Sequence, residues 1–271
     1  MEDLFWIQVI ASFFIGGIVI GGQSIAVEKA PKKYSGIIAG LPTTMVVSLF
    51  FLFLGQPLNN ISNQLSGMPL AVTGVISFMA VCCLVAPIFK RSIPGFLLTL
   101  LCSYGIWIFF PFLAAIFRPV PWSISVPTFI IIVGAWQYVL WKKVQNIKPN
   151  RKTLPFSWPL LIFRSLFAGT VIAVSLIIFN LLSPFWGIVI GSAFPIAWSV
   201  QVILFYWRQP RKEMAHMFLF APMSSSMFVV YFAMAAWLFP LLGVWWGSLV
   251  CTIVSWIIAF ALSKITNRLQ P

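Results

Sequence analysis

The sequence has very few charged residues, and acidic residues are the scarcest of them. Only 8% of its 271 residues are charged, with 4 Asp and Glu against 17 Lys and Arg, and the net charge is +13. Soluble domains carry about 25% charged residues, so these few charges could not cover a surface exposed to water. With 61% hydrophobic residues, the chain predicts an all-α polytopic membrane protein, because helices satisfy their backbone groups internally in lipid.

Groups that perform acid–base or metal chemistry are almost absent from the apolar part of the chain. Glu2 and Asp3 stand at the N-terminus, and the other two acids are Glu28 and Glu213. The four cysteines lie inside apolar runs, without CxxC or Cys/His spacing. Acid–base and metal-assisted chemistry need such groups. We therefore expect no enzyme activity, no catalytic residue, no bound metal and no cofactor.

Long uncharged apolar runs occupy most of the chain and predict nine transmembrane helices. A bilayer core requires about 20 apolar residues for each helix that crosses it. The runs are residues 4–26, 34–54, 68–89, 94–117, 124–141, 159–181, 186–207, 214–239 and 243–263.

The basic residues lie almost entirely in or beside alternate connections between these runs. All of the 17 Lys and Arg residues except Arg118 fall on what would be one side of the membrane. Basic short loops are retained in the cytoplasm, which predicts an outside N-terminus and a cytoplasmic C-terminus. The bases are spread over several short loops, which favours contact with lipid headgroups over nucleic-acid binding.

Short motifs recur in the same order in the two halves of the chain. Cys-x4-Trp occurs at Cys102 in the fourth run and at Cys251 in the ninth. The second and seventh runs each contain a GxxxG motif followed by a proline, formed by Gly36, Gly40 and Pro42 and by Gly187, Gly191 and Pro195.

These recurrences predict two four-helix repeats, a first half at residues 1–120 and a second half at 159–271. A central helix and a basic cytoplasmic loop at 121–158 would join them. Equivalent helices are separated by an odd number of crossings, so the repeats are expected to be inverted, as in many secondary transporters.

Part of the sequence resembles a known family. The Gly–Pro pattern of the second run, and the stretch Leu-Phe-Pro-Leu-Leu-Gly-Val-Trp-Trp-Gly at 238–247 leading to Cys251 and Trp256, resemble the GlpM family. That family consists of four-helix bacterial inner-membrane proteins, and the resemblance is stronger over residues 160–265 than in the first half. Two inverted four-helix units with a joining helix are also similar to the drug/metabolite transporter superfamily. Both resemblances imply a fold more than a substrate.

Polar residues near the two prolines form the predicted substrate-binding site. A proline removes a backbone donor and frees a carbonyl inside its helix, and breaks at corresponding positions of two repeats indicate a transport site. Two simpler interpretations stay open: the GxxxG glycines serve close packing, and the hydroxyls bond to their own helices. The predicted residues are Thr43, Thr44, Ser48, Trp198, Ser199, Gln201, Ser224, Ser225, Ser226 and Tyr231.

These features favour a secondary transporter that moves a small neutral, zwitterionic or anionic metabolite by alternating access. Proton-coupled export of organic cations is disfavoured, because the runs contain no carboxylate. The alternative is a membrane interaction or assembly subunit that does not transport. The lipid bilayer is the expected partner in both cases, no nucleic acid is expected, and the oligomeric state stays open.

Overall fold

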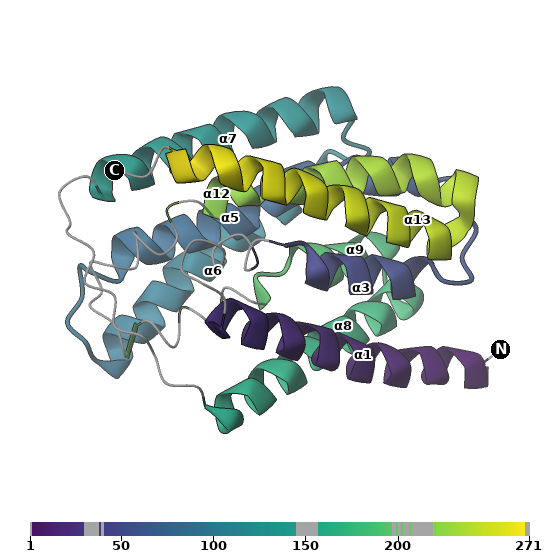
Figure 1. The fold of residues 1–271 in the computed structure, drawn as a ribbon, viewed down its shortest axis with the longest axis horizontal. Coiled ribbons are helices and arrows are strands. Elements are labelled where there is room, and N and C mark those ends of the chain that lie inside the picture. The colour runs from purple at the N-terminus through teal and green to yellow at the C-terminus, as the bar shows by residue number, and fades with distance from the viewer. Residues whose placement is uncertain are drawn as a thin grey trace.

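The computed structural model describes residues 2–29, 38, 41–144, 157–196, 199, 202, 206–207, 219 and 221–268. This part of the chain forms helices joined by turns and contains no β-strand. Most of the helices run roughly along the long axis of the molecule (Figure 1). The prediction of an all-helical protein is therefore confirmed for the described residues.

Six helical segments are long and apolar enough to cross a membrane. Their length and composition indicate an integral membrane protein. The segments are α1 (Glu2–Lys29), α4 with α5 (Ile61–Leu65 and Met68–Val85), α6 (Ile93–Ile116), α7 (Trp122–Val144), α8 (Trp158–Leu181), and α12 with α13 (Ala221–Ser224 and Ser226–Arg268).

The second and seventh predicted spans are not continuous helices. In their place the structure describes two shorter apolar helices, α3 (Thr43–Phe53) and α9 (Pro184–Ala193). Helix α3 begins after Pro42, and α9 ends two residues before Pro195. A proline lacks the backbone donor, and its ring clashes with the carbonyl four residues earlier. Nine uninterrupted spanning helices are therefore not seen among the described residues, and the nine-helix prediction is not confirmed.

Helix α13 contains most of the eighth predicted run and all of the ninth, because the chain turns back within it at Gly243. This glycine has a φ of 74°, which residues with a Cβ rarely adopt. Pro240 removes a backbone donor three residues before the turn. Figure 1 shows the two limbs of α13 running in opposite directions, so this element forms a helical hairpin.

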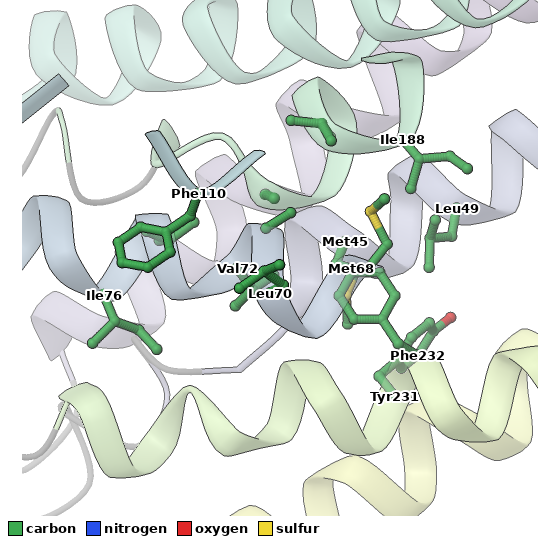
Figure 2. Close-up of a cluster of buried hydrophobic side chains, with 14 of the residues drawn as sticks. Met45, Leu49, Met68, Leu70, Val72, Ile76, Phe110, Ile188, Tyr231 and Phe232 are labelled. Carbon is green, nitrogen blue, oxygen red and sulfur yellow. The ribbon is translucent and has the colours of Figure 1, made fainter. Parts of the chain in front are cut away.

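The core lies around α5, with the two short helices inside the bundle. In the most apolar stretch of α4 and α5, 83% is buried inside the protein, whereas 22% of the corresponding stretch of α7 is buried. Helix α5 is therefore central and α7 is peripheral. Figure 2 shows Met45 and Leu49 of α3, Ile188 of α9 and Tyr231 of α13 in one buried cluster with side chains of α5. Helices α3 and α9, which are too short to cross the membrane alone, thus contribute side chains to the same buried core as α5.

Candidate functional site

Helices α1 and α8 cross at closely packed glycines. A Cβ on Gly17 of α1 would lie 2.9 Å from the carbonyl oxygen of Ser165, and one on Gly169 of α8 would overlap the carbonyl oxygen of Phe13. Gly17 follows Phe13 by the same interval as Gly169 follows Ser165. The two contacts are therefore the same contact made reciprocally, which is the arrangement that a local two-fold axis produces.

The Pro195 break, at residues 194–195, follows the last turn of α9. Phe194 is extended, with φ −81° and ψ 135°, and the last carbonyls of a helix have no partner within it. Ser48 Oγ of α3 donates to Gly191 O at 2.6 Å, and Trp107 Nε1 of α6 donates to Ala193 O at 2.7 Å. Both donors come from the first half of the chain, so this break is held by the opposite half.

A tyrosine of the first half also reaches the residues after the Pro195 break. Ser199 Oγ donates to Pro195 O at 2.6 Å, and it lies 2.7 Å from the hydroxyl of Tyr104. Because a serine hydroxyl has one proton, Tyr104 is the donor in this second contact. The ring of Tyr104 stacks on Phe194 with centroids 5.9 Å apart. The Tyr104 side chain therefore contacts both sides of the break.

The Pro42 break, at residues 41–42, is held by a different kind of contact. Pro42 has a ψ of 38°, outside the helical range. Gln23 Nε2 of α1 donates to Ile38 O at 2.7 Å and more weakly to Leu41 O at 3.4 Å, while Gln23 Oε1 accepts a hydrogen bond from Thr43 Oγ1. All of these residues belong to the first half, so this break is held by its own half.

Small residues let three helices meet beside the Pro195 break. A Cβ on Gly191 would lie 2.8 Å from Ser175 Oγ of α8 and 3.0 Å from Ser48 Cβ of α3. One turn earlier, Gly187 packs against the backbone of Phe179, and a Cβ on Gly187 would lie 2.5 Å from the Phe179 Cα. The second GxxxG motif therefore lies in close helix contacts, and its second glycine also accepts the Ser48 bond.

The serines before α13 lie apart from the two breaks. Ser224 Oγ donates to Ala221 O at 3.0 Å, and Ser225 Oγ donates to Pro222 O at 2.5 Å, so both hydroxyls bond within their own turn. Helix α12 packs against α7 and α13. Ser226 is half-buried at the first turn of α13. Self-bonding, the simpler interpretation, accounts for Ser224 and Ser225.

The remaining predicted residues divide into described and undescribed positions. Thr44 is half-buried in the first turn of α3, and Tyr231 is fully buried in α13. Gly36, Gly40, Trp198 and Gln201 lie outside the described residues.

The Cys-x4-Trp motif occupies unlike environments in the two halves. In α6, Cys102 is exposed and Trp107 is buried, whereas in α13 Cys251 is buried and Trp256 is exposed. The recurrence in sequence therefore does not correspond to one structural role.

Gln23, Tyr104 and Trp107 are absent from the residues predicted to form the site. A signal for Trp107 was present, since a buried indole N–H normally finds an acceptor and a broken helix offers free carbonyls. Nothing local in the sequence pairs Gln23 with the Pro42 break. Within the described part of the chain, no three His, Cys, Asp or Glu side chains are grouped so that they could hold a metal ion.

The two halves also meet where α3, α6 and α8 end. Gln56 Nε2 donates to Asn180 Oδ1 at 3.2 Å, and the Arg118 guanidinium lies 4.7 Å from the centroid of the Phe185 ring. Desolvation lowers the pKa of Arg118 from its usual value. The first and second halves are therefore joined at this end of the bundle by one hydrogen bond and one cation–π contact.

Among known protein families, the chain matches one described as a protein of unknown function (DUF3147) over residues 9–120. The matched segment begins within α1 and ends just after α6. It coincides with most of the predicted first repeat and covers less than half of the chain. No curated protein and no solved structure matches the chain. The match supports neither the GlpM resemblance nor the transporter superfamily, and both stay predictions.

Proposed function

We propose that this protein is a secondary transporter that moves a small neutral, zwitterionic or anionic metabolite by alternating access. The observation that carries the proposal is the contact between two interrupted helices, in which Ser48 of α3 donates to Gly191 of α9 inside the bundle. Interrupted helices from two repeats typically surround the substrate site of such transporters.

The spacing of prolines supports the inverted duplication that this mechanism requires. The prolines between residues 31 and 87 recur with the same spacing between residues 184 and 240. Neither interval contains any other proline. Proline restricts the backbone more than any other residue, so this agreement is stronger than a recurrence of Gly, Ile or Val. The two sets are Pro31, Pro42, Pro57, Pro69 and Pro87, and Pro184, Pro195, Pro210, Pro222 and Pro240.

Helix neighbours and directions give the duplication independent support. Helices α1 and α8, which begin the two proposed repeats, run in opposite directions in Figure 1 and share the reciprocal glycine contacts. The neighbours also correspond: α1 packs on α3 as α8 packs on α9, and α5 packs on α9 as α13 packs on α3. A rocking motion of one half against the other would act around this crossing.

The groups at the breaks favour cargo without a net positive charge. The side chains that contact the Pro195 break, Ser48, Tyr104 and Trp107, are hydrogen-bond donors and carry no charge. A cation buried here would need a carboxylate to compensate its lost hydration. An anionic group could instead use backbone N–H groups at the start of α3.

Flux through reconstituted protein tests the proposal. Purified protein in liposomes would be screened with labelled polyols, amino acids and small organic acids, and we expect saturable uptake of at least one of them. Trp107→Phe and Ser48→Ala should reduce that uptake, whereas Ser123→Ala, at an exposed position of α7, should not. Folded protein without flux across the panel would favour the alternative, a subunit that does not transport.

We further propose an outside N-terminus and a cytoplasmic C-terminus, following the distribution of basic residues. The membrane would be a bacterial inner membrane, as the resemblance to the GlpM family implies. Cysteines at Ser62 and Ser183 should then react with impermeant reagents from the extracytoplasmic side, and cysteines at Lys33 and Lys148 only from the cytoplasm. Labelling of the Ser62 and Lys33 positions from the same side would refute this orientation.

A further inference from the structure

An aromatic side chain from the second half of the chain packs into the turn between α5 and α6. The hydroxyl of Tyr206 donates to Lys90 O at 3.2 Å, and the centroids of the Tyr206 and Phe96 rings are 5.2 Å apart. A Cβ on Gly95 would lie 2.9 Å from the Tyr206 hydroxyl oxygen, so the glycine leaves room for it. Tyr206 is fully buried. This turn of the first half is therefore packed against a residue of the second half.

A phenylalanine from the first half makes a similar contact at the turn of α13. Phe53 is the last residue of α3, and its ring centroid lies 6.2 Å from that of Phe239 and 5.8 Å from that of Phe179. Phe239 immediately precedes Pro240, in the segment that turns at Gly243. Phe53 and Phe239 are both buried. This turn of the second half is therefore packed against a residue of the first half.

The two aromatic residues occupy corresponding positions of the proposed repeats. In the register of the five proline pairs, Tyr206 corresponds to Phe53, and Lys90 corresponds to Gly243. Each half therefore places an aromatic side chain at the equivalent turn of the other half. A reciprocal exchange of this kind is what a local two-fold axis produces.

The two contacts lie at opposite ends of the bundle. Figure 1 shows the α13 turn at the end of the molecule where the N-terminus lies, and the α5–α6 connection at the other end. Under the orientation proposed above, the Tyr206 contact faces the cytoplasm and the Phe53 contact faces the opposite side. The two halves are therefore joined by a buried aromatic side chain at each end.

The proposed transport site lies between these two contacts. Along α3, Ser48 lies inward of Phe53, and its hydroxyl donates to α9. Along α6, Trp107 lies inward of Phe96, and its indole also donates to α9. A molecule that reaches the Pro195 break from either end would have to pass one of the two aromatic contacts.

We propose that Tyr206 and Phe53 are the two gates of the transporter, an inference that rests on the proposed function and deepens it. Because each contact joins the two halves, one end opens only when its aromatic side chain leaves the turn of the opposite half. The other contact then keeps the far end closed, as alternating access requires. The gates differ in one interaction, since Tyr206 also donates to a backbone carbonyl, whereas Phe53 has no polar atom in its side chain.

Distances between spin labels on α6 and α8 test the inference at both ends of the bundle. Ile93 and Ile162 lie near the beginnings of these helices, and Ile116 and Leu182 lie near their ends. All four are exposed, and each pair has one member in each half. The labels would be attached to cysteines at these positions in the full-length protein in liposomes. Cys102→Ala would remove the exposed native cysteine, since the other three are buried.

Each gate variant should open its own end alone. Tyr206→Phe keeps the ring and loses the bond to Lys90 O, and we expect it to at least double the population with a longer distance between positions 93 and 162. Phe53→Leu loses both ring contacts and should have that effect on positions 116 and 182. In each variant the other pair should keep the distance distribution of the unsubstituted protein.

Two substitutions of the same kinds, placed away from the turns, serve as matched controls. Tyr138→Phe removes a hydroxyl from an exposed tyrosine of α7. Phe78→Leu removes a buried ring whose centroid lies 4.8 Å from that of Tyr104 in the same half. Neither control should change either distance distribution. If Phe78→Leu lengthens the same distances as Phe53→Leu, general loss of packing explains the result and the Phe53 gate is overturned.

The Tyr206 gate has its own refuting results. An unchanged distance between positions 93 and 162 in Tyr206→Phe would show that the hydroxyl does not hold that end closed. Longer distances at both ends in this variant would show that the two contacts do not act separately, which also overturns the inference. If Phe53→Leu does not fold, Tyr206→Phe decides the matter alone, because it keeps its ring packing.

The gates and the transport function can fail separately. Saturable uptake by liposomes, without a change confined to one end in either gate variant, would overturn the gates and leave transport standing. Changes confined to the expected ends, without uptake of any compound in the panel, would support the two closures and count against transport.

Discussion

The two proline breaks occupy corresponding positions in the two halves but are held in opposite ways. At the Pro42 break, Gln23 of the same half bonds to the Ile38 and Leu41 carbonyls. At the Pro195 break, donors from the other half, Ser48 and Trp107, bond to the carbonyls of α9. The two halves therefore hold their proline breaks with different polar contacts.

This difference shows where relative movement of the halves would be resisted. Moving one half against the other leaves the Gln23 bonds intact, because both partners move together. The same movement must break or replace the bonds to Gly191 and Ala193. The α1–α8 crossing differs from the breaks, because each half contributes the same kind of contact there: Gly17 and Gly169 each pack against a backbone carbonyl of the other helix.

The largest loss of stability is expected at the α1–α8 crossing, where equivalent substitutions in the two halves should have equal effects. Gly17→Ala and Gly169→Ala each place a methyl group against a backbone carbonyl, and we expect each to lower the free energy of unfolding by about 3 kcal/mol, the upper end for overpacking. Gly22→Ala, in the same helix as Gly17 with open space around it, should raise that free energy by about 0.5–1 kcal/mol. Denaturation in detergent measures all three, and a large loss at only one crossing glycine would argue against reciprocal contacts.

The next effect should distinguish the two tryptophans of the repeated motif. Trp107→Phe leaves the Ala193 carbonyl without its donor, and we expect a loss of about 2 kcal/mol in unfolding free energy. Trp256→Phe changes an exposed side chain and should shift that free energy by less than about 0.5 kcal/mol. Equal losses from the two substitutions in the same denaturation assay would contradict the unlike roles of Cys-x4-Trp.

A smaller loss of stability is expected at the Pro42 break, and its local effect should show that the two breaks are held independently. Gln23→Leu removes the donor to the Ile38 and Leu41 carbonyls, and we expect it to lower the unfolding free energy by about 1 kcal/mol. Amide hydrogen exchange should then rise at the start of α3 and stay unchanged at the end of α9. Trp107→Phe should give the reverse pattern, and faster exchange at both breaks in either variant would mean that they are not held independently.

The smallest effect is expected where the two halves meet near the C-terminal ends of α6 and α8. Arg118→Ala removes an exposed cation–π contact with Phe185, and we expect a loss of about 0.5 kcal/mol in unfolding free energy. Phe185→Leu should remove the same interaction, so the double variant should lose less than the sum of the two single variants. Strict additivity in this double-mutant cycle would show that the ring and the guanidinium do not interact.

The helical and membrane-embedded character of the chain could be predicted from the sequence, because the length and composition of hydrophobic runs are local properties. The orientation that the charge alternation predicts stays a prediction. The proline positions also predicted both helix interruptions, and with them the neighbourhood of Ser48 and Ser199. The expectation that the second and seventh runs would each form a full-length span is not confirmed, because the described helices are interrupted where Pro42 and Pro195 remove a backbone donor.

The partners at the breaks could not be predicted in the same way. In a chain that is apolar on every side, hydrophobic periodicity does not reveal which face of a helix is buried. Tyr104 and Trp107 were therefore not assigned to the break that they contact. The serines at 224 and 225 looked equally suitable in sequence, and the structure shows both bonding within their own turn.

The sequence by itself determined that the chain lies in a membrane, that it is helical, and that its prolines recur in register. These properties depend on composition and on short-range backbone chemistry. Only the tertiary structure decided that Ser48 bonds to Gly191, a residue 143 positions away, and that Gln23 holds the opposite break. Such pairings depend on how helices pack, and packing in lipid is governed by shape and a few polar contacts, which no local pattern encodes.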